Sequence, residues 1–382
     1  MKNIKSEGEV KRYGARNMNV TFIFKCNCSN RIGLGHISRS QILASEIAYL
    51  GFSTKFVIRN LPGANNKFTK RIKDIYWLNS ESETDAETSY WLEENELVDA
   101  IQTCDVIQKI KKDGEEKIVL IFDNYGITDK WVSVVSEYVD SIVCFDDVPS
   151  RKLPVDIVIN YNPGIKRSDY FSYIVPRTKM LVGVEFSPLA IDYQKINESL
   201  KLRKVRVEEV KRILIFIGSG YAGVFFNVLL NAVKSISLSK YQFTLVVNVD
   251  IFKNNSDVPN NVTVENIGGD MVEILAKHQL VIGSAGISSL ERLCLGVPSL
   301  LMQIADNQRE LYKFLTDNEY AVGLGYHADI TSEYFISKLI SIVDDRDLRL
   351  LIKRNGLELV DGFGAKRLAD NIINETFKSI EG

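Results

Sequence analysis

The sequence predicts an α/β protein of two Rossmann-like domains, each built on a parallel sheet, that face each other across an interdomain cleft. Strand and helix patterns alternate along the chain, which favours parallel strands joined by helices. A strand, a glycine-rich loop and a helix follow one another from residue 20, and the same succession starts again at residue 212. With 382 residues, the chain is long enough for two domains that each have a core.

Breaks in this pattern predict the domain boundaries. We interpret residues 1–18 as a polar tail, 19–185 as the first domain, 186–211 as a charged linker or surface helix, and 212–382 as the second domain. The last helix is a candidate to pack back on the first domain. Two facing Rossmann-like domains of this kind constitute the GT-B fold.

The balance of charges excludes some classes of partner. The chain has 47 Lys and Arg residues against 49 Asp and Glu residues, which gives no long-range attraction to nucleic acid. Residues 1–18 lack the apolar core of a signal peptide, and no apolar run has the roughly eighteen residues that span a membrane. We therefore expect a cytoplasmic protein, monomeric or weakly oligomeric, with no integral membrane segment.

The five cysteines favour neither a zinc site nor disulfides. Cys26 and Cys28 have strand spacing and no histidine close by in the sequence. Buried thiols in a reducing compartment are the expectation for all five. No metal and no cofactor is predicted.

The first domain shows strand patterns that alternate with helices. Strands are expected at 20–26, 53–59, 117–122, 141–145 and 157–159, with helices ending near 50 and spanning 92–111 and 131–138. Residues 68–78 combine a short helix with a strand. Acidic residues crowd between 80 and 99, and we expect them to form a solvated loop followed by the exposed face of the helix from Leu92 to Lys111.

The second domain repeats the alternation. Its expected strands are 212–217, 243–247, 262–264, 280–282 and 299–302. Helices are expected at 271–277, 333–344, 348–359 and 365–377. Two further helices are expected to end near 236 and near 295.

The loop after the first strand is the first candidate site. Gly33 and Gly35 open a helix whose N-terminal N–H groups and dipole can bind the phosphates of a nucleotide. The loop is not a dinucleotide fingerprint, because Ser38 stands where that motif has Gly or Ala. His36 lies at the mouth of this loop and is a candidate general base or, alternatively, a helix cap. Arg39 follows one turn later on the same helix as a candidate ligand contact.

Polar side chains follow three successive strands of the first domain. Asp123 and Tyr125 come after 117–122, Asp146 and Asp147 after 141–145, and Asn162 after 157–159. Because ligands bind at the carboxyl ends of strands in open α/β sheets, we expect these side chains to lie at one edge with His36.

A second glycine-rich loop opens a helix in the second domain. Gly286, Ser288 and Ser289 can bind a phosphate or cap the helix, and Glu291 can accept hydrogen bonds from a ribose diol or complement the helix dipole. Asn307 and Gln308 follow the next strand. Gly218 and Ser219, after the strand at 212–217, are further candidates for nucleotide binding.

These motifs, taken in order, resemble those of a known family. They are Gly33-Leu34-Gly35-His36-Ile37-Ser38-Arg39, Asp123-Asn124-Tyr125-Gly126, Asp146-Asp147, Asn160-Tyr161-Asn162, Glu291-Arg292-Leu293-Cys294-Leu295-Gly296-Val297-Pro298 and Asn307-Gln308. The chain is similar to the nucleotide-sugar hydrolases of pseudaminic acid biosynthesis, which act on UDP-2,4-diacetamido-2,4,6-trideoxy-β-L-altropyranose. It resembles more distantly the peptidoglycan N-acetylglucosaminyltransferase, which has a GT-B fold.

The resemblance implies a metal-independent attack of water on the anomeric carbon of a UDP-sugar, with inversion. His36 would then activate the water. The sugar would be bound by Arg39, Tyr125, Asn162, Asn307 and Gln308. UDP would be bound by Gly33, Gly35, Gly218, Ser219, Gly286, Ser288, Ser289 and Glu291.

Two other interpretations remain open at this point. The chain differs from the family pattern at Asn124, Tyr221 and Leu290, which leaves room for a GT-B glycosyltransferase with an acceptor other than water. A non-catalytic protein that binds sugar nucleotides is the third possibility. A histidine retained at the predicted edge argues against it.

Overall fold

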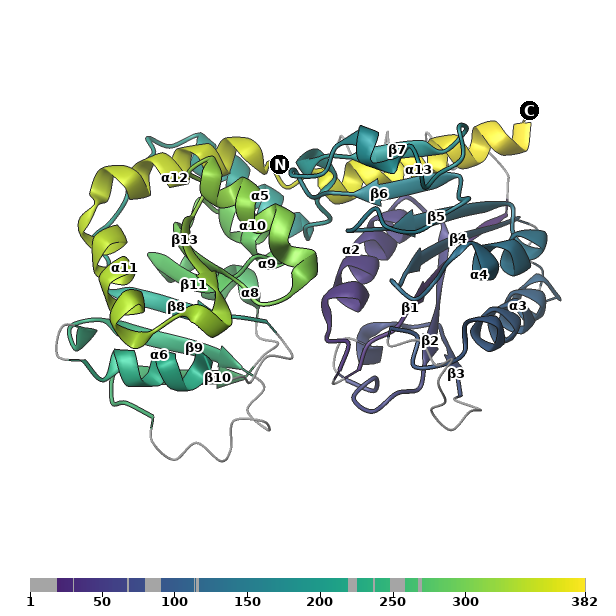
Figure 1. Ribbon diagram of the computed structural model, residues 1–382. Coiled ribbons are helices and arrows are strands. Elements are labelled where there is room, and N and C mark those ends of the chain that lie inside the picture. Colours follow the sequence, from purple (N-terminus) through teal and green to yellow (C-terminus); the bar gives the residue numbers. More distant parts are fainter. Residues whose placement is uncertain are drawn as a thin grey trace. The chain divides into compact units, whose positions relative to one another are not determined.

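The computed structural model describes residues 19–29, 31–66, 69–79, 91–112, 114, 117–218, 225–235, 238–247, 258–266 and 270–381. The chain divides into two compact units, each drawn in Figure 1. The first unit contains residues 19–161, Ile165–Pro188 and the segment from Gly364. The second contains Asn162–Gly164 and Leu189–Phe363.

The first unit is built on a seven-stranded sheet in which every pair of neighbouring strands is parallel. The spatial order is β3-β2-β1-β4-β5-β6-β7. The strands are β1 (Val20–Cys26), β2 (Ser53–Arg59), β3 (Ile75–Leu78), β4 (Lys117–Asp123), β5 (Ser141–Phe145), β6 (Ile157–Asn160) and β7 (Lys179–Val182). Because the strands are parallel, their carboxyl ends share one edge of the sheet.

Helices cover both faces of this sheet (Figure 1). The helices α3 (Glu96–Lys112) and α4 (Asp129–Val135) pack on one face, where Trp131 and Ile107 join the core with Phe122. The helices α2 (Gly35–Tyr49) and α13 (Gly364–Glu381) pack against each other on the opposite face. There, Phe52 contacts Phe377 of α13 at a ring distance of 6.0 Å. The C-terminal helix is therefore part of the first unit.

The second unit is built on a six-stranded sheet of order β10-β9-β8-β11-β12-β13, again parallel throughout. Its strands are β8 (Arg212–Phe216), β9 (Gln242–Val247), β10 (Val262–Asn266), β11 (Leu280–Ser284), β12 (Ser299–Gln303) and β13 (Val322–Tyr326). Its helices are α5 (Ile191–Lys201), α6 (Phe225–Val233), α8 (Met271–Ala276), α9 (Ile287–Cys294), α10 (Arg309–Asp317), α11 (Ser332–Asp344) and α12 (Arg346–Leu359).

The predicted fold class is confirmed, since both sheets are parallel and of the Rossmann type. The sequence patterns did not indicate β7 or β13. The first has four residues, and the second, Val-Gly-Leu-Gly-Tyr, contains two glycines, so neither shows a strong strand signal. Residues 68–78 contain a 3₁₀ turn, Thr69–Arg71, followed by β3. Within the predicted linker, Ile191–Lys201 is the helix α5.

The prediction of a solvated acidic stretch is wrong for Glu94 and Asp99. Residues 80–90 lie outside the described residues, and α3 begins at Glu96 rather than at Leu92. Glu94 and Asp99 are fully buried, where both contact the guanidinium of Arg59. The charge pattern could not indicate this, because the cations that neutralise these acids come from β1 and β2.

The expected burial of the cysteines is confirmed. All five are free thiols with buried side chains. Burial raises the pKa of Cys28 and Cys104 to about 11, so these thiols are protonated at neutral pH.

Candidate active site

The loop from β1 to α2 is a tight turn organised by Ser29. Its hydroxyl accepts hydrogen bonds from the N–H groups of Arg31 (3.1 Å) and Ile32 (3.0 Å). Gly33 closes the turn with a φ of +84°, in the region that favours glycine, and donates its N–H to the Ser29 carbonyl at 2.9 Å. The helix α2 then begins at Gly35.

His36 is the second residue of α2, and its ring is directed at β4 rather than at the helix end. Its Nδ1 lies 2.6 Å from Oδ1 of Asp123, the last residue of β4. The side chain of Asp123 is 1% exposed and that of His36 is 12% exposed. The interpretation of His36 as a helix cap is therefore wrong.

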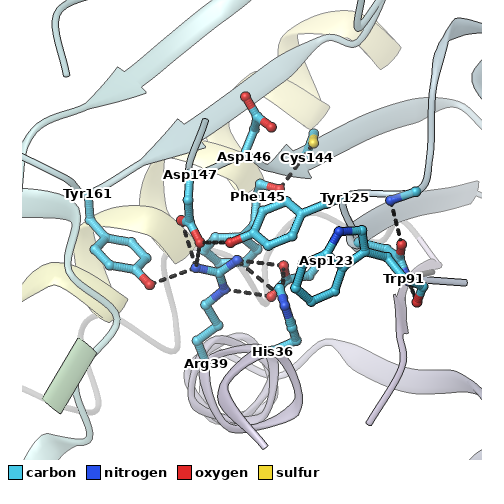
Figure 2. A network of polar contacts seen from close by, with 12 residues as sticks. His36, Arg39, Trp91, Asp123, Tyr125, Cys144, Phe145, Asp146, Asp147 and Tyr161 are labelled. Carbon is cyan, nitrogen blue, oxygen red and sulfur yellow. Dashed lines mark hydrogen bonds and ion pairs between the residues drawn. The ribbon is translucent and has the colours of Figure 1, made fainter. Parts of the chain in front are cut away.

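Arg39 lies at the centre of the polar network drawn in Figure 2. It donates to Asp123 through Nε and Nη2, both at 2.6 Å. Through Nη1 it donates to both carboxylate oxygens of Asp147 at 2.8 Å and to the Tyr161 hydroxyl at 2.6 Å. One guanidinium thus joins the carboxyl ends of β4, β5 and β6.

Arg39, which is predicted to contact the sugar, is buried within this network. Its side chain is 4% exposed, and each of its three nitrogens donates to a protein group. Its ring neighbours are Phe145 at 5.1 Å and Tyr161 at 5.5 Å. Arg39 therefore fixes the strand ends and the orientation of Asp123.

Aromatic rings border this network on the side of His36 (Figure 2). The ring of Tyr125 lies 5.1 Å from that of His36 and 4.9 Å from that of Trp91, with nearly perpendicular planes in both pairs. The Tyr125 hydroxyl donates to Oδ2 of Asp147. His36 thus lies beside the rings of Trp91 and Tyr125, and its Nδ1 contacts the Asp123 carboxylate.

The network fixes the charge states of its members. Burial acts to raise the pKa of Asp123, but the charge of Arg39 and the hydrogen bonds from Arg39 and His36 outweigh it and hold that pKa well below its usual range. Burial acts to lower the pKa of Arg39, but the charges of Asp123 and Asp147 raise it. Burial and the charge of Asp147 raise the pKa of Tyr125. At neutral pH, Asp123 is therefore ionised, and Tyr125 remains a hydrogen-bond donor.

Asp146 and Asp147 are sequence neighbours with different environments. Figure 2 shows the Asp146 carboxylate pointing away from Arg39, and it pairs instead with Arg151 at 2.7 Å. Burial raises the pKa of Asp146 to about 6, against the opposing charge of Arg151. Arg151 also donates to the backbone carbonyls of Ile127 and Asn124, so it supports the loop that carries Tyr125.

In the second unit, the loop between β11 and α9 brings the backbone into close contact with a buried arginine. A Cβ on Gly283 would lie 2.5 Å from Nη1 of Arg292 and 2.6 Å from the Phe216 carbonyl oxygen, so only glycine fits. Arg292 is 1% exposed and donates to the Ser284 carbonyl at 2.8 Å and to the Ser288 hydroxyl at 3.3 Å. This guanidinium holds the loop against the first turn of α9.

The predicted nucleotide-binding residues of this loop lie around the N-terminus of α9. Gly286 is the N-cap, and the Ser289 hydroxyl donates to its carbonyl at 2.6 Å, with Ser289 only 2% exposed. Ser288 is partly exposed. Burial raises the pKa of Glu291 to about 7, against the opposing effects of the neighbouring Tyr193 hydroxyl and of Arg292.

The remaining predicted residues fall into three places. Gln308 lies beside Gly286, since a Cβ added to Gly286 would be 3.9 Å from Gln308 Nε2. Asn307 is in the same 3₁₀ turn as Gln308. Gly218 follows β8 with a φ of +130°, and Ser219 is outside the described residues. Asn162 is grouped with the second unit, and its Oδ1 accepts the N–H of Gly164 at 2.9 Å.

The structure therefore brings His36, Arg39 and Tyr125 together in the first unit, and Gly286, Ser288 and Gln308 in the second. Sequence reasoning did not select Trp91, Tyr161 or Arg151. Tyr161 lay within a quoted motif and follows a strand, which is a usable signal. The placement of Trp91 and Arg151 depends on loop conformations that have no such signal.

The described residues contain neither a metal-binding cluster nor a membrane-spanning helix. Among them, no group of three His, Cys, Asp or Glu side chains is arranged to hold a metal ion. No helix in the described part of the chain is long and apolar enough to cross a membrane.

The two parallel Rossmann-like units have the GT-B fold, as comparison with solved structures shows. MurG of Acinetobacter baumannii is similar with a TM-score of 0.59 and 12% identity, over 93% of this chain and 99% of that chain. UGT71G1 of Medicago truncatula, solved in complex with UDP-glucose, is similar with a TM-score of 0.62 and 14% identity, over 97% of this chain and 100% of that chain.

The chain is also similar in sequence to the spore coat polysaccharide biosynthesis protein SpsG of Bacillus subtilis (strain 168). The two are 24% identical over 352 residues, which is 88% of this chain and 93% of that protein. No protein-family model matches the chain.

Proposed function

We propose that this protein is an enzyme that hydrolyses a UDP-linked diacetamido-trideoxy sugar at its anomeric carbon. The products are UDP and a free sugar for nonulosonic acid biosynthesis of the pseudaminic type. The observation that carries the proposal is the 2.6 Å contact between His36 Nδ1 and the buried Asp123 carboxylate. A histidine with one nitrogen on a carboxylate is held in the tautomer whose other nitrogen can accept a proton.

The chemistry follows from that tautomer. With Nδ1–H donated to Asp123, Nε2 of His36 accepts a proton from water as the water oxygen bonds to the anomeric carbon. The bond between the anomeric carbon and the β-phosphate oxygen breaks with inversion, and its electron pair leaves on UDP. Asp123 keeps its charge throughout because Arg39 donates to both of its oxygens.

The second unit supports binding of the departing UDP. The N-terminus of α9 offers backbone N–H groups and the positive end of a helix dipole to the pyrophosphate, with the partly exposed Ser288 hydroxyl beside them. Glu291 on the same helix accepts hydrogen bonds from the ribose. Gln308 lies next to Gly286 and would contact the phosphate or the sugar.

A second candidate function is transfer of the sugar to an acceptor other than water. It is favoured by the fold neighbours, of which UGT71G1 was solved with a UDP-sugar, and by the similarity to a polysaccharide biosynthesis protein. The first chemical steps are common to both functions. In the transferase, His36 takes its proton from an acceptor hydroxyl.

One assay tests the proposal and separates the two functions. The protein is incubated in EDTA with UDP-2,4-diacetamido-2,4,6-trideoxy-β-L-altropyranose and with a panel of other UDP-sugars, and the release of UDP and of free sugar is measured. We expect equal amounts of UDP and free sugar from the first substrate without an acceptor. UDP release only when a polysaccharide or lipid acceptor is added would establish the transferase instead. Absence of UDP release under both conditions would refute both functions.

The UDP site has its own test in Glu291. Because burial raises the pKa of this carboxyl to about 7, the ionised form that accepts ribose hydroxyl groups increases between pH 6 and pH 8. UDP affinity should therefore rise over that range in the wild-type protein. In Glu291→Gln it should be independent of this ionisation and weaker at pH 8 by about 1.5–3 kcal/mol, the range for hydrogen bonds to a charged group. Calorimetric titration with UDP at pH 6, 7 and 8 measures both effects.

A further inference from the structure

Trp91 lies against the proposed base without belonging to any motif of the sequence. Its ring is 6.1 Å from that of His36 and 4.9 Å from that of Tyr125, in edge-to-face contact with both (Figure 2). The residue is partly exposed. It lies beside the proposed base and beside Tyr125, which the family resemblance assigns to the sugar.

The backbone after Trp91 is tied to the strand ends of the sheet. Asn124 donates its side-chain amide to the Trp91 carbonyl at 2.9 Å. Asn27, which follows β1, donates to the Leu92 carbonyl at 3.2 Å. The Ser29 hydroxyl donates to Glu93 at 3.0 Å. Three consecutive residues are thus held by the same loops that carry His36 and Tyr125.

The next residue of this segment anchors it to buried charges. Glu94 pairs with Arg59 at 3.2 Å, and Arg59 pairs with Asp99 at 2.7 Å. Lys25 completes the group with a 3.1 Å contact to Asp99, and all four side chains are 0% exposed. Displacing the segment would leave a buried charge without its partner, which is strongly unfavourable. The backbone that carries Trp91 is therefore fixed to the protein by these contacts.

We infer that Trp91 forms an apolar wall for the sugar of the UDP-sugar and thereby determines which sugars are accepted. The inference rests on the proposed function, and it extends that function to a residue outside the motifs quoted from the sequence. An indole surface recognises the C–H groups of a pyranose and its methyl substituents, because these are the apolar parts of a sugar. The preferred substrate is then a deoxy sugar that turns a methyl group or an apolar ring face to Trp91.

Equilibrium binding tests the inference apart from turnover. The measurements are made in a His36→Asn background so that the sugar nucleotide is not consumed. The ligands are UDP-2,4-diacetamido-2,4,6-trideoxy-β-L-altropyranose and UDP alone. We expect Trp91→Ala to weaken binding of the sugar nucleotide by roughly tenfold or more, the scale of a lost apolar contact in a pocket. Affinity for UDP should be unchanged.

Tryptophan fluorescence gives a second readout in variants that retain an aromatic ring. The chain has three tryptophans, Trp77, Trp91 and Trp131. The change in emission that the sugar nucleotide causes beyond that of UDP should disappear in Trp91→Phe. It should persist in the matched control Trp77→Phe, because Trp77 is on β3 with 40% of its surface exposed.

The outcomes separate this inference from the proposed function. Equal affinities of Trp91→Ala and its parent for the sugar nucleotide, or a sugar-specific fluorescence change that survives in Trp91→Phe, would overturn the role of Trp91. Neither result bears on catalysis. Wild-type turnover in the His36→Asn protein would instead overturn the proposed function.

Discussion

The first unit contains two arginine-centred ion clusters that are similar in composition but differ in exposure. The Arg39 cluster joins Asp123 and Asp147 at the carboxyl ends of β4 and β5. The Arg59 cluster joins Glu94 and Asp99, with Lys25 as a second cation. In the Arg59 cluster every charged side chain is 0% exposed, whereas in the Arg39 cluster Asp147 is 17% and the attached His36 12% exposed.

The difference in exposure determines whether each cluster can contact a ligand. A cluster that is sealed on all sides can only hold secondary structure together, and here it fixes the start of α3 and the segment after Trp91. A cluster with partly exposed members can exchange a proton with a ligand while its buried members keep their charges. We therefore expect substitutions in the Arg39 cluster to change catalysis and those in the Arg59 cluster to change stability.

The largest expected effect is on turnover in His36→Asn. Asparagine retains a hydrogen bond to Asp123 but cannot accept a proton at neutral pH. Turnover should fall by roughly two to four orders of magnitude, the usual range for a positioned acid–base group, while the melting temperature and UDP affinity remain close to wild type. His327→Asn, in the second unit, is the matched control and should leave turnover unchanged. Wild-type turnover in His36→Asn would refute the assignment of His36 as the general base.

Next in size is the loss of stability in Asp99→Asn. This change leaves Lys25 and Arg59 buried with only Glu94 as a charged partner. The free energy of unfolding should fall by about 3–5 kcal/mol, the cost of breaking a buried ion pair. Asp140→Asn, which affects a partly exposed pair with Lys117, should cost less than about 1 kcal/mol. Urea unfolding measures both, and equal effects of the two changes would contradict the distinction by exposure.

Asp146, which lies beside the Arg39 cluster, should make a smaller contribution to the free energy of unfolding, and this contribution should depend on pH. Burial raises its pKa in the folded state to about 6, above the value of about 3.9 in an unfolded chain. The folded state therefore binds the proton more tightly, and the contribution of Asp146 to stability decreases as the pH rises from about 4 to about 6. The difference in unfolding free energy between wild type and Asp146→Asn should change by about 1–3 kcal/mol over this range. A constant difference between pH 4 and pH 7 would refute the assignment.

The smallest effect is expected for Tyr125→Phe, which removes one donor to Asp147 and keeps the ring beside His36. Arg39 still donates to both oxygens of Asp147, so stability should change by only about 1 kcal/mol. KM for the sugar nucleotide should rise while UDP affinity stays constant. A loss of UDP affinity would show that Tyr125 itself contributes to nucleotide binding and would contradict its assignment to the sugar.

Some of the candidate site could be predicted because its residues are tied to secondary structure. His36 follows a strand and a glycine-rich turn, and Asp123 and Asp147 lie at the ends of two strands that prove to be spatial neighbours. In a parallel sheet, chain direction alone places such residues at one edge. Their order in the sequence was therefore sufficient to predict that they meet.

The same reasoning could not predict how these residues pair. Nothing in the spacing of Arg39 indicates that it would bind both Asp123 and Asp147 and become buried, nor that Asp146 would turn to Arg151 instead. Glu94 and Asp99 looked like part of an exposed acidic stretch, because their cations are 35 and 40 residues away at Arg59. Side-chain pairing across the fold leaves no periodic trace in the sequence.

The sequence by itself determined the alternation of strands and helices, the parallel sheets and the two glycine-rich loops, because these depend on hydrophobic periodicity and on backbone preferences over a few residues. Only the tertiary structure decided which charges are buried, which helix the C-terminal α13 packs against, and that Trp91 lies beside His36. Those features depend on contacts between segments far apart in the chain. Their energies come from burial and from charge neutralisation. Both require that distant segments have already been brought together by folding.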